Sequence, residues 1–105
     1  MAAPHIPTLG AKRAIRRIGT DLRIARLRRR LPMEVVAARA FISRGTLARV
    51  EQGDPAVSFG IYASVMQALG LIGSLSGLLA DDQAGADLEV ERLPKRVRTK
   101  KVAET

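Results

Sequence analysis

The sequence lacks several residue types that common functional sites require. None of its 105 residues is cysteine or tryptophan, and His5 is its only histidine. Without cysteine there is no disulfide and no thiolate metal site, and a lone histidine between Pro4 and Pro7 offers no metal or acid–base site. Paired carboxylates, an activated nucleophile and a glycine-rich phosphate loop are also missing. We therefore expect no catalytic residues, no metal and no cofactor, and the chain is not expected to be an enzyme.

Two further scarcities limit the choice of partner. Only three residues are aromatic, so a base-stacking surface for single-stranded nucleic acid is poorly supplied. No apolar run approaches the roughly 18 residues of a membrane-spanning helix. Residues 1–10 also lack the apolar region of a secretory signal. We expect a cytoplasmic protein with no membrane partner.

What the chain has instead is positive charge, unevenly placed. The formal net charge is +8. Residues 12–30 contain nine Lys or Arg residues against Asp21 alone, whereas residues 31–82 are slightly acidic. Residues 87–105 contain six bases against four acids. Two basic segments that flank a near-neutral centre suit a polyanionic partner.

The length allows one small domain with tails. We place a flexible segment at residues 1–10, the domain at 11–80, and a linker with a basic tail at 81–105. Apolar and charged residues alternate over 88–93, which predicts either one short strand or part of a disordered basic tail.

The centre of the domain contains two short helical patterns with a tight break between them. Pro32 suits the start of the first, which runs to about Arg39, because the N–H that proline lacks would be unpaired there. Val36, Ala37 and Ala40 recur at the spacing of one buried stripe. The first helix is therefore expected to be amphipathic, with this stripe in the core.

The second pattern runs from Ser43 to Gln52. The Ser43 hydroxyl suits the N-cap, and Gly53 suits the position just after the helix, where a positive φ is needed. Leu47 and Val50 are predicted to face the core. The opposite face carries four exposed residues: Arg44, Gly45, Thr46 and Arg49. A helix with an apolar back and a basic, small-residue front suits a DNA major groove, which is about 12 Å wide.

Further helical patterns lie on both sides of this pair. One begins near residue 11, although Gly19 interrupts it at about 1 kcal/mol relative to alanine. Residues 11–17 either extend that helix or form a basic arm. Ser58 is predicted to cap a helix over about 59–69, and residues 72–79 form a short fifth helix.

The central stretch, with its residues at the same spacing, resembles the helix-turn-helix of the Xre/Cro family of bacterial and phage repressors. The resemblance covers about residues 18–79 and implies an all-α, five-helix, lambda-repressor-like bundle. The residues that match are Leu31, Glu34, Val36, Ala37, Ala40, Ile42, Ser43, Arg44, Thr46, Leu47, Val50, Glu51 and Gly53.

The resemblance implies roles for particular residues in a homodimer on a palindromic operator. It implies base reading by Arg44, Gly45, Thr46 and Arg49, phosphate contacts at Ser43, Met33, Arg23 and Arg30, and an ion pair between Arg26 and Glu51. The implied dimer seam comprises Leu71, Ile72, Leu75, Leu78 and Leu79, or else these apolar residues close the monomer core.

Two residues depart from the family pattern. The family usually has glutamine where Met33 stands, and methionine cannot donate to a phosphate. It usually has glycine where Phe41 stands in the turn. If that site keeps a positive φ, phenylalanine there costs about 1–2 kcal/mol. We expect either a different turn or packing of Phe41 that offsets the strain.

The stretch from Gly53 to Leu71, with ERLPKRVR at residues 91–98, resembles HipB-type antitoxins, which repress their own operon and bind a HipA-like kinase toxin. That resemblance implies a type II toxin–antitoxin pair in a bacterial cytoplasm, with the protein at the nucleoid when bound. The alternatives are a stand-alone regulator of the Xre family with no toxin partner and, from another class, a basic RNA-binding adaptor.

Overall fold

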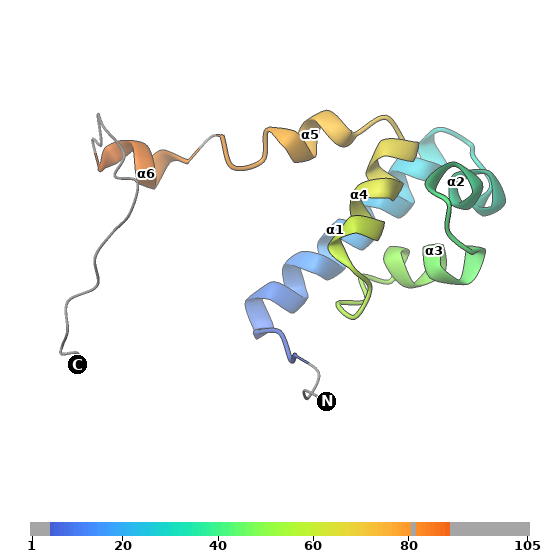
Figure 1. Cartoon of the computed structure of the whole chain (residues 1–105), viewed down its shortest axis with the longest axis horizontal. Coiled ribbons are helices and arrows are strands. Elements are labelled where there is room, and N and C mark those ends of the chain that lie inside the picture. The colour runs from blue at the N-terminus through green and yellow to red at the C-terminus, as the bar shows by residue number, and fades with distance from the viewer. Residues whose placement is uncertain (1–4, 81, 89–105) are drawn as a thin grey trace.

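The computed structural model describes residues 5–80 and 82–88, and within them every regular element is a helix (Figure 1). The six helices are α1 (Leu9–Arg28), α2 (Met33–Ala40), α3 (Arg44–Glu51), α4 (Phe59–Ala68), α5 (Ile72–Ser76) and α6 (Gln83–Asp87). The predicted fold class, an all-α helix-turn-helix bundle, is confirmed.

One apolar core holds the bundle together. Its most deeply buried side chains are Val36 of α2, Leu47 and Val50 of α3, and Val65 of α4. Helix α2 packs against both α3 and α4, and α1 packs against α3. Each of these short helices presents an apolar stripe inward, so the core is built by the periodicity that the sequence predicts.

The basic N-terminal stretch is helical. Helix α1 begins at Leu9, two residues before the predicted start, because the Thr8 hydroxyl accepts a hydrogen bond from the N–H of Ala11 at 3.2 Å. Residues 11–17 therefore extend the helix and do not form a separate arm.

Gly19, which the sequence marks only as an interruption, is a contact point between helices. It is buried in α1, where a Cβ would lie 2.5 Å from the carbonyl oxygen of Val50 and 2.6 Å from the backbone nitrogen of Gly53. Gly53 has the predicted positive φ, 71°. The missing side chain of Gly19 thus lets α1 pass directly over the end of α3.

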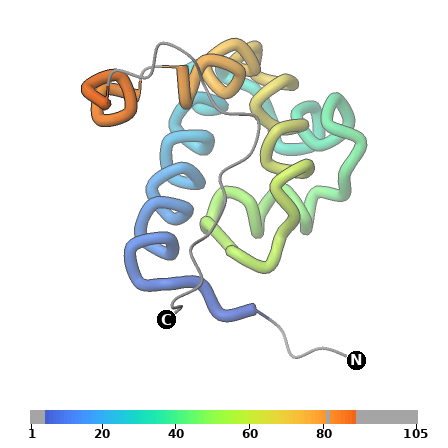
Figure 2. The backbone as a smooth tube through the Cα atoms, turned by 60° about the vertical axis from the view of Figure 1, so that its left-hand side comes forward, coloured from blue at the N-terminus to red at the C-terminus, as the bar shows by residue number. Residues whose placement is uncertain are grey.

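The last two described helices leave the bundle. Figures 1 and 2 show α5 and α6 following α4 away from α2 and α3, and neither helix has a buried residue. Helix α5 ends at Ser76, earlier than the predicted residue 79, and α6 lies in the stretch predicted as a linker, where the Asp82 carboxylate caps it by accepting from the N–H of Gly85 at 2.9 Å. Leu88 lies in the turn after α6, and residues 89–93 of the predicted strand lie outside the described residues.

Candidate nucleic-acid interface

Helix α3 starts at a well-formed cap. The Ser43 hydroxyl accepts a hydrogen bond from the N–H of Thr46 at 3.0 Å and donates to its hydroxyl, also at 3.0 Å. The N–H groups of the first turn otherwise point outward from the helix end, where the helix dipole favours an anion. At Gly45 an added Cβ would meet only the Ser43 hydroxyl, at 3.9 Å. The fold therefore does not itself need glycine at that position.

The two sides of α3 differ as an interface helix requires. Leu47 and Val50 are fully buried and anchor the helix, while the side chains of Arg44 and Arg49 are 65% and 51% exposed. Both guanidinium groups are thus on the outside, next to the unobstructed Gly45.

Each of these arginines has a carboxylate beside it. Nη1 of Arg44 lies 3.3 Å from the Glu34 carboxylate at the start of α2, and Nε of Arg49 donates to Oδ2 of Asp54 at 2.8 Å. Both pairs are solvent-exposed, so their effect on the free energy of unfolding is small. Their effect is on the direction in which the arginines point.

A buried ion pair joins α1 to α3. Arg26 donates from Nε to Oε2 of Glu51 at 2.6 Å and from Nη2 to Oε1 at 3.1 Å, and its Nη1 donates to the carbonyl oxygen of Leu31 at 3.0 Å. The side chains are 10% and 7% exposed. The hydrogen bond to Glu51 raises the pKa of Arg26. A bidentate pair forms only in a narrow range of relative orientations, so this pair fixes the orientation of α3 against α1.

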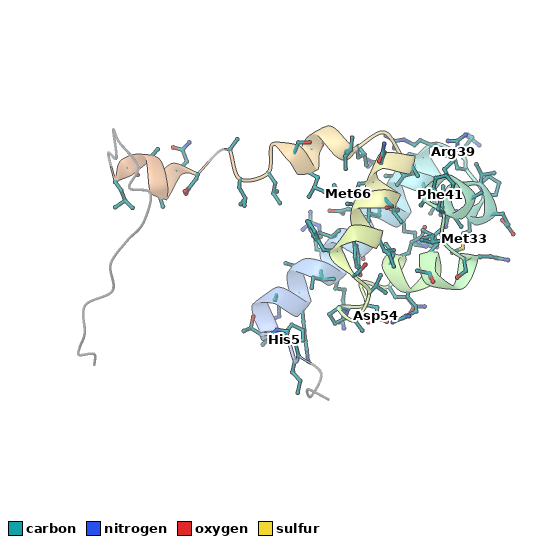
Figure 3. All side chains as sticks on the ribbon, viewed as in Figure 1. His5, Met33, Arg39, Phe41, Asp54 and Met66 are labelled. Atoms are coloured by element: carbon teal, nitrogen blue, oxygen red, sulfur yellow. The ribbon has the colours of Figure 1, made fainter. Side chains whose placement is uncertain are left out.

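The turn between α2 and α3 departs from expectation. Phe41 adopts φ 58° and ψ 41°, so the left-handed conformation of the family turn is kept. Its side chain is 94% exposed. The expectation that the turn differs, or that packing of Phe41 offsets the strain, is wrong. Figure 3 shows Phe41 beside Arg39, at the α2 end of the molecule.

The four residues predicted to contact phosphates lie in four different settings. Met33 begins α2 and packs against the core, a role its thioether suits better than hydrogen bonding. Arg30 has φ 53° in the turn after α1, where the N–H of Leu31 bonds to the carbonyl oxygen of Arg26 at 3.2 Å. Arg23 is an exposed residue of α1. Ser43 caps α3 as described above.

A hydrogen-bonded group around Asp54, just after the end of α3, was not predicted from the sequence. Asp54 lies below the end of α3 in Figure 3, and its Oδ1 accepts from the N–H of Ala56 at 2.8 Å. That bond and the one from Arg49 hold the pKa of the Asp54 carboxyl below its usual value. The hydroxyl of buried Tyr62 donates to the carbonyl oxygen of Asp54 at 2.8 Å, and burial raises the pKa of Tyr62. An aspartate followed by proline is typical of a turn, so the turn at Asp54 is predictable from the sequence, but the hydrogen-bond partners of Asp54 are not.

The predicted dimer seam is largely uncovered. Leu78 and Leu79 are 63% and 84% exposed, and Ile72 is also exposed. Leu71 packs against the core and Leu75 is half-buried. An apolar hollow of about 380 Å³ adjoins them; it is lined by side chains from α1, from the turn before α4, and from α4, α5 and Leu78.

Two negative findings apply to the part of the chain that the structure describes. None of its helices combines the length and apolar character that crossing a bilayer requires. No group of three or more His, Asp or Glu side chains within residues 5–80 and 82–88 is arranged to hold a metal ion.

A family model described as a helix-turn-helix domain matches residues 17–79. No curated protein and no solved structure matches the chain. The matched range contains α1 from Arg17 onward, all of α2, α3, α4 and α5, and both members of the Arg26–Glu51 pair.

Proposed function

Because the chain belongs to the helix-turn-helix domain family, whose members bind DNA, we propose that it is a sequence-specific transcriptional repressor that places α3 in the major groove. The observation that carries the proposal is the two-sided character of α3. Leu47 and Val50 are fully buried behind it, and the guanidinium groups of Arg44 and Arg49 are exposed in front.

The residues proposed to face DNA on α3 have suitable counterparts there, although Thr46 is half-buried and not exposed as the sequence predicts. Arg44 and Arg49 are the base readers, since arginine donates to O6 and N7 of guanine and discriminates by about 1–3 kcal/mol. The Thr46 methyl suits a thymine methyl, and Gly45 leaves room for close approach. Ser43 and the start of α3 suit a phosphate, as does the start of α2 at Met33 through its backbone.

The basic residues of α1 add a second, sequence-independent component. Arg23 is exposed on α1, and Arg30 is exposed in the turn that follows it. Guanidinium groups at such sites attract phosphate and release counterions, so they raise affinity for any duplex. They position the protein but do not select a sequence.

We further propose that the repressor is a homodimer formed through Leu71, Ile72, Leu75, Leu78 and Leu79. An α-helical domain of this size is marginal alone, and the exposed apolar side chains after α4 have no cover among the described residues. A two-fold dimer would place two α3 helices in successive major grooves about 34 Å apart.

Selection of duplexes from a random-sequence library, followed by gel shift on the enriched duplex, tests the base-reading role. Arg49→Ala should weaken binding to the enriched duplex by about ten-fold or more and relax one base preference. Arg17→Ala is the matched control, because Arg17 is an exposed arginine of α1 that pairs with Asp21. It should weaken enriched and scrambled duplexes alike. If the wild-type protein enriches no sequence, the proposed function is wrong.

The regulated operon is proposed from the second resemblance. Residues 53–71 and 91–98 support a HipB-like antitoxin that represses its own operon in a bacterial cytoplasm and binds a HipA-like kinase. Co-expression with the product of the adjacent gene, followed by size exclusion, tests this. Two proteins that never co-elute would leave a stand-alone regulator. Displacement of bound duplex by RNA, but not by a second duplex, would instead favour the RNA-binding adaptor.

A further inference from the structure

Arg49 is held by a residue that lies outside the recognition helix. Its Nε donates to Oδ2 of Asp54 at 2.8 Å, and its two Nη atoms make no hydrogen bond within the described residues. Because Nε lies at the base of the guanidinium fork, this bond fixes the plane of the group. The two terminal nitrogens remain free to donate in parallel, which is how arginine reads guanine.

Asp54 is itself fixed from two directions. Its Oδ1 accepts from the N–H of Ala56, and its carbonyl oxygen accepts from the hydroxyl of Tyr62, both at 2.8 Å. Tyr62 is buried on α4. A continuous chain of hydrogen bonds thus runs from the core, through the turn after α3, to the exposed side chain of Arg49.

We propose that Asp54 is a specificity-determining residue of the DNA interface, which positions Arg49 for bidentate contact with one guanine, and that Tyr62 fixes Asp54 for this task. The inference rests on the proposed function. A free arginine loses much side-chain freedom when it binds. Holding it beforehand lowers that loss only for the base that matches the held geometry. Asp54 therefore contributes selectivity although its charge repels phosphate.

Asp54→Asn separates positioning from support of the turn. The asparagine Oδ1 can still accept from the N–H of Ala56, but the Nδ2 amino group that replaces Oδ2 cannot accept from Nε of Arg49. The probes are the duplex enriched by the wild-type protein and a scrambled duplex of the same composition. The ratio of the two affinities should fall by about three- to ten-fold, while affinity for the scrambled duplex stays equal or rises because one negative charge is gone.

Three further variants make the result specific. Asp21→Asn removes the same charge from α1 and should leave the ratio unchanged. Tyr62→Phe keeps the buried ring but removes the hydrogen bond to Asp54, and should lower the ratio by a smaller factor. In an Arg49→Ala background, Asp54→Asn should change the ratio no further, because the residue that it positions is absent.

A readout without DNA accompanies the binding assay. The ¹H–¹⁵N resonance of the Arg49 Nε–H should be shifted and slowly exchanging in the wild type, and should move to the position of a solvated arginine in Asp54→Asn. If the wild type selects its duplex but Asp54→Asn leaves the affinity ratio unchanged, this inference alone is overturned. A fall that persists in the Arg49→Ala background also overturns it. Failure of the wild type to select any duplex overturns the proposed function and this inference together.

Discussion

At the scale of single residues, Phe41 is the clearest departure from what an optimised fold would contain. It holds a left-handed conformation at φ 58°, and its ring, 94% exposed, packs on almost nothing. Only glycine adopts this conformation without steric penalty. The strain is therefore uncompensated within the described chain.

Phe41→Gly should consequently stabilise the protein. Relief of the strain is worth about 1–2 kcal/mol, and the greater freedom of glycine in the unfolded chain removes part of it. We expect the free energy of unfolding to rise by about 0.5–1 kcal/mol, measured by urea denaturation. Phe59→Gly is the control: Phe59 is also exposed but lies in the first turn of α4, so the same change there should destabilise. Equal effects at the two sites would contradict the account.

Residue-level prediction from sequence worked where the interaction is local. Ser43 and Gly53 were identified because caps depend on a few neighbouring positions, and the structure places both at the ends of α3. The sequence leaves the left-handed conformation of Phe41 as one of two possibilities, since sequence alone does not give φ. The Asp54–Tyr62 bond joins α4 to a turn eight residues earlier, and its residue types carry no spacing signal.

At the scale of elements, the approach of α1 to α3 depends on two glycines. Gly19 of α1 lies against the backbone of Val50 and Gly53, and a Cβ on Gly53 would lie 2.4 Å from the Cα of Arg16. The contact is backbone to backbone, so neither side can move aside as a flexible side chain does. Together with the Arg26–Glu51 pair, it sets the position of α3 on α1.

Gly19→Ala should therefore destabilise the fold although alanine is the better helix former. The propensity gain of about 1 kcal/mol is smaller than the cost of the forced backbone shift, so we expect a net loss of about 1–2 kcal/mol. Gly10→Ala is the matched control, because Gly10 lies in the same helix with nothing near its added Cβ, and it should be neutral or stabilising. Denaturant titrations of both variants give the comparison. A stabilised Gly19→Ala protein would show that α1 does not pass as closely as described.

The helices of the bundle were predictable because their apolar spacing and caps are encoded within each segment. The bounds of α2 and α3 differ from expectation by a residue at each end. The contact role of Gly19 was not predictable, because it depends on which helix lies opposite. Helix α6 was missed because DDQAGAD reads as a linker, and the Asp82 cap that starts it is followed by only five helical residues.

At the scale of the whole molecule, the proposed homodimer depends on the exposed apolar residues after α4. In the proposed complex a single α3 would contact only a few base pairs, and linking two such contacts raises affinity by about 10²–10⁴ without new contacts to DNA. The exposed Leu78 and Leu79, beside the apolar hollow against α1 and α4, are the part of the described surface best suited to supply that link.

A Leu78→Glu protein should therefore be monomeric at micromolar concentration yet still folded, because Leu78 is already 63% exposed in the single chain. Its affinity for a palindromic duplex should fall by at least about ten-fold, while its affinity for a half-site duplex should change little. Leu9→Glu is the control, since Leu9 is equally exposed at 63% but lies at the start of α1, and it should remain dimeric.

Light scattering after size exclusion measures the mass, and gel shift on the two duplexes measures the affinities. A Leu78→Glu protein that stays dimeric and binds the palindrome normally would place the dimer contact elsewhere. The proposed base-reading role of α3 would be unaffected, because the half-site duplex tests that role separately.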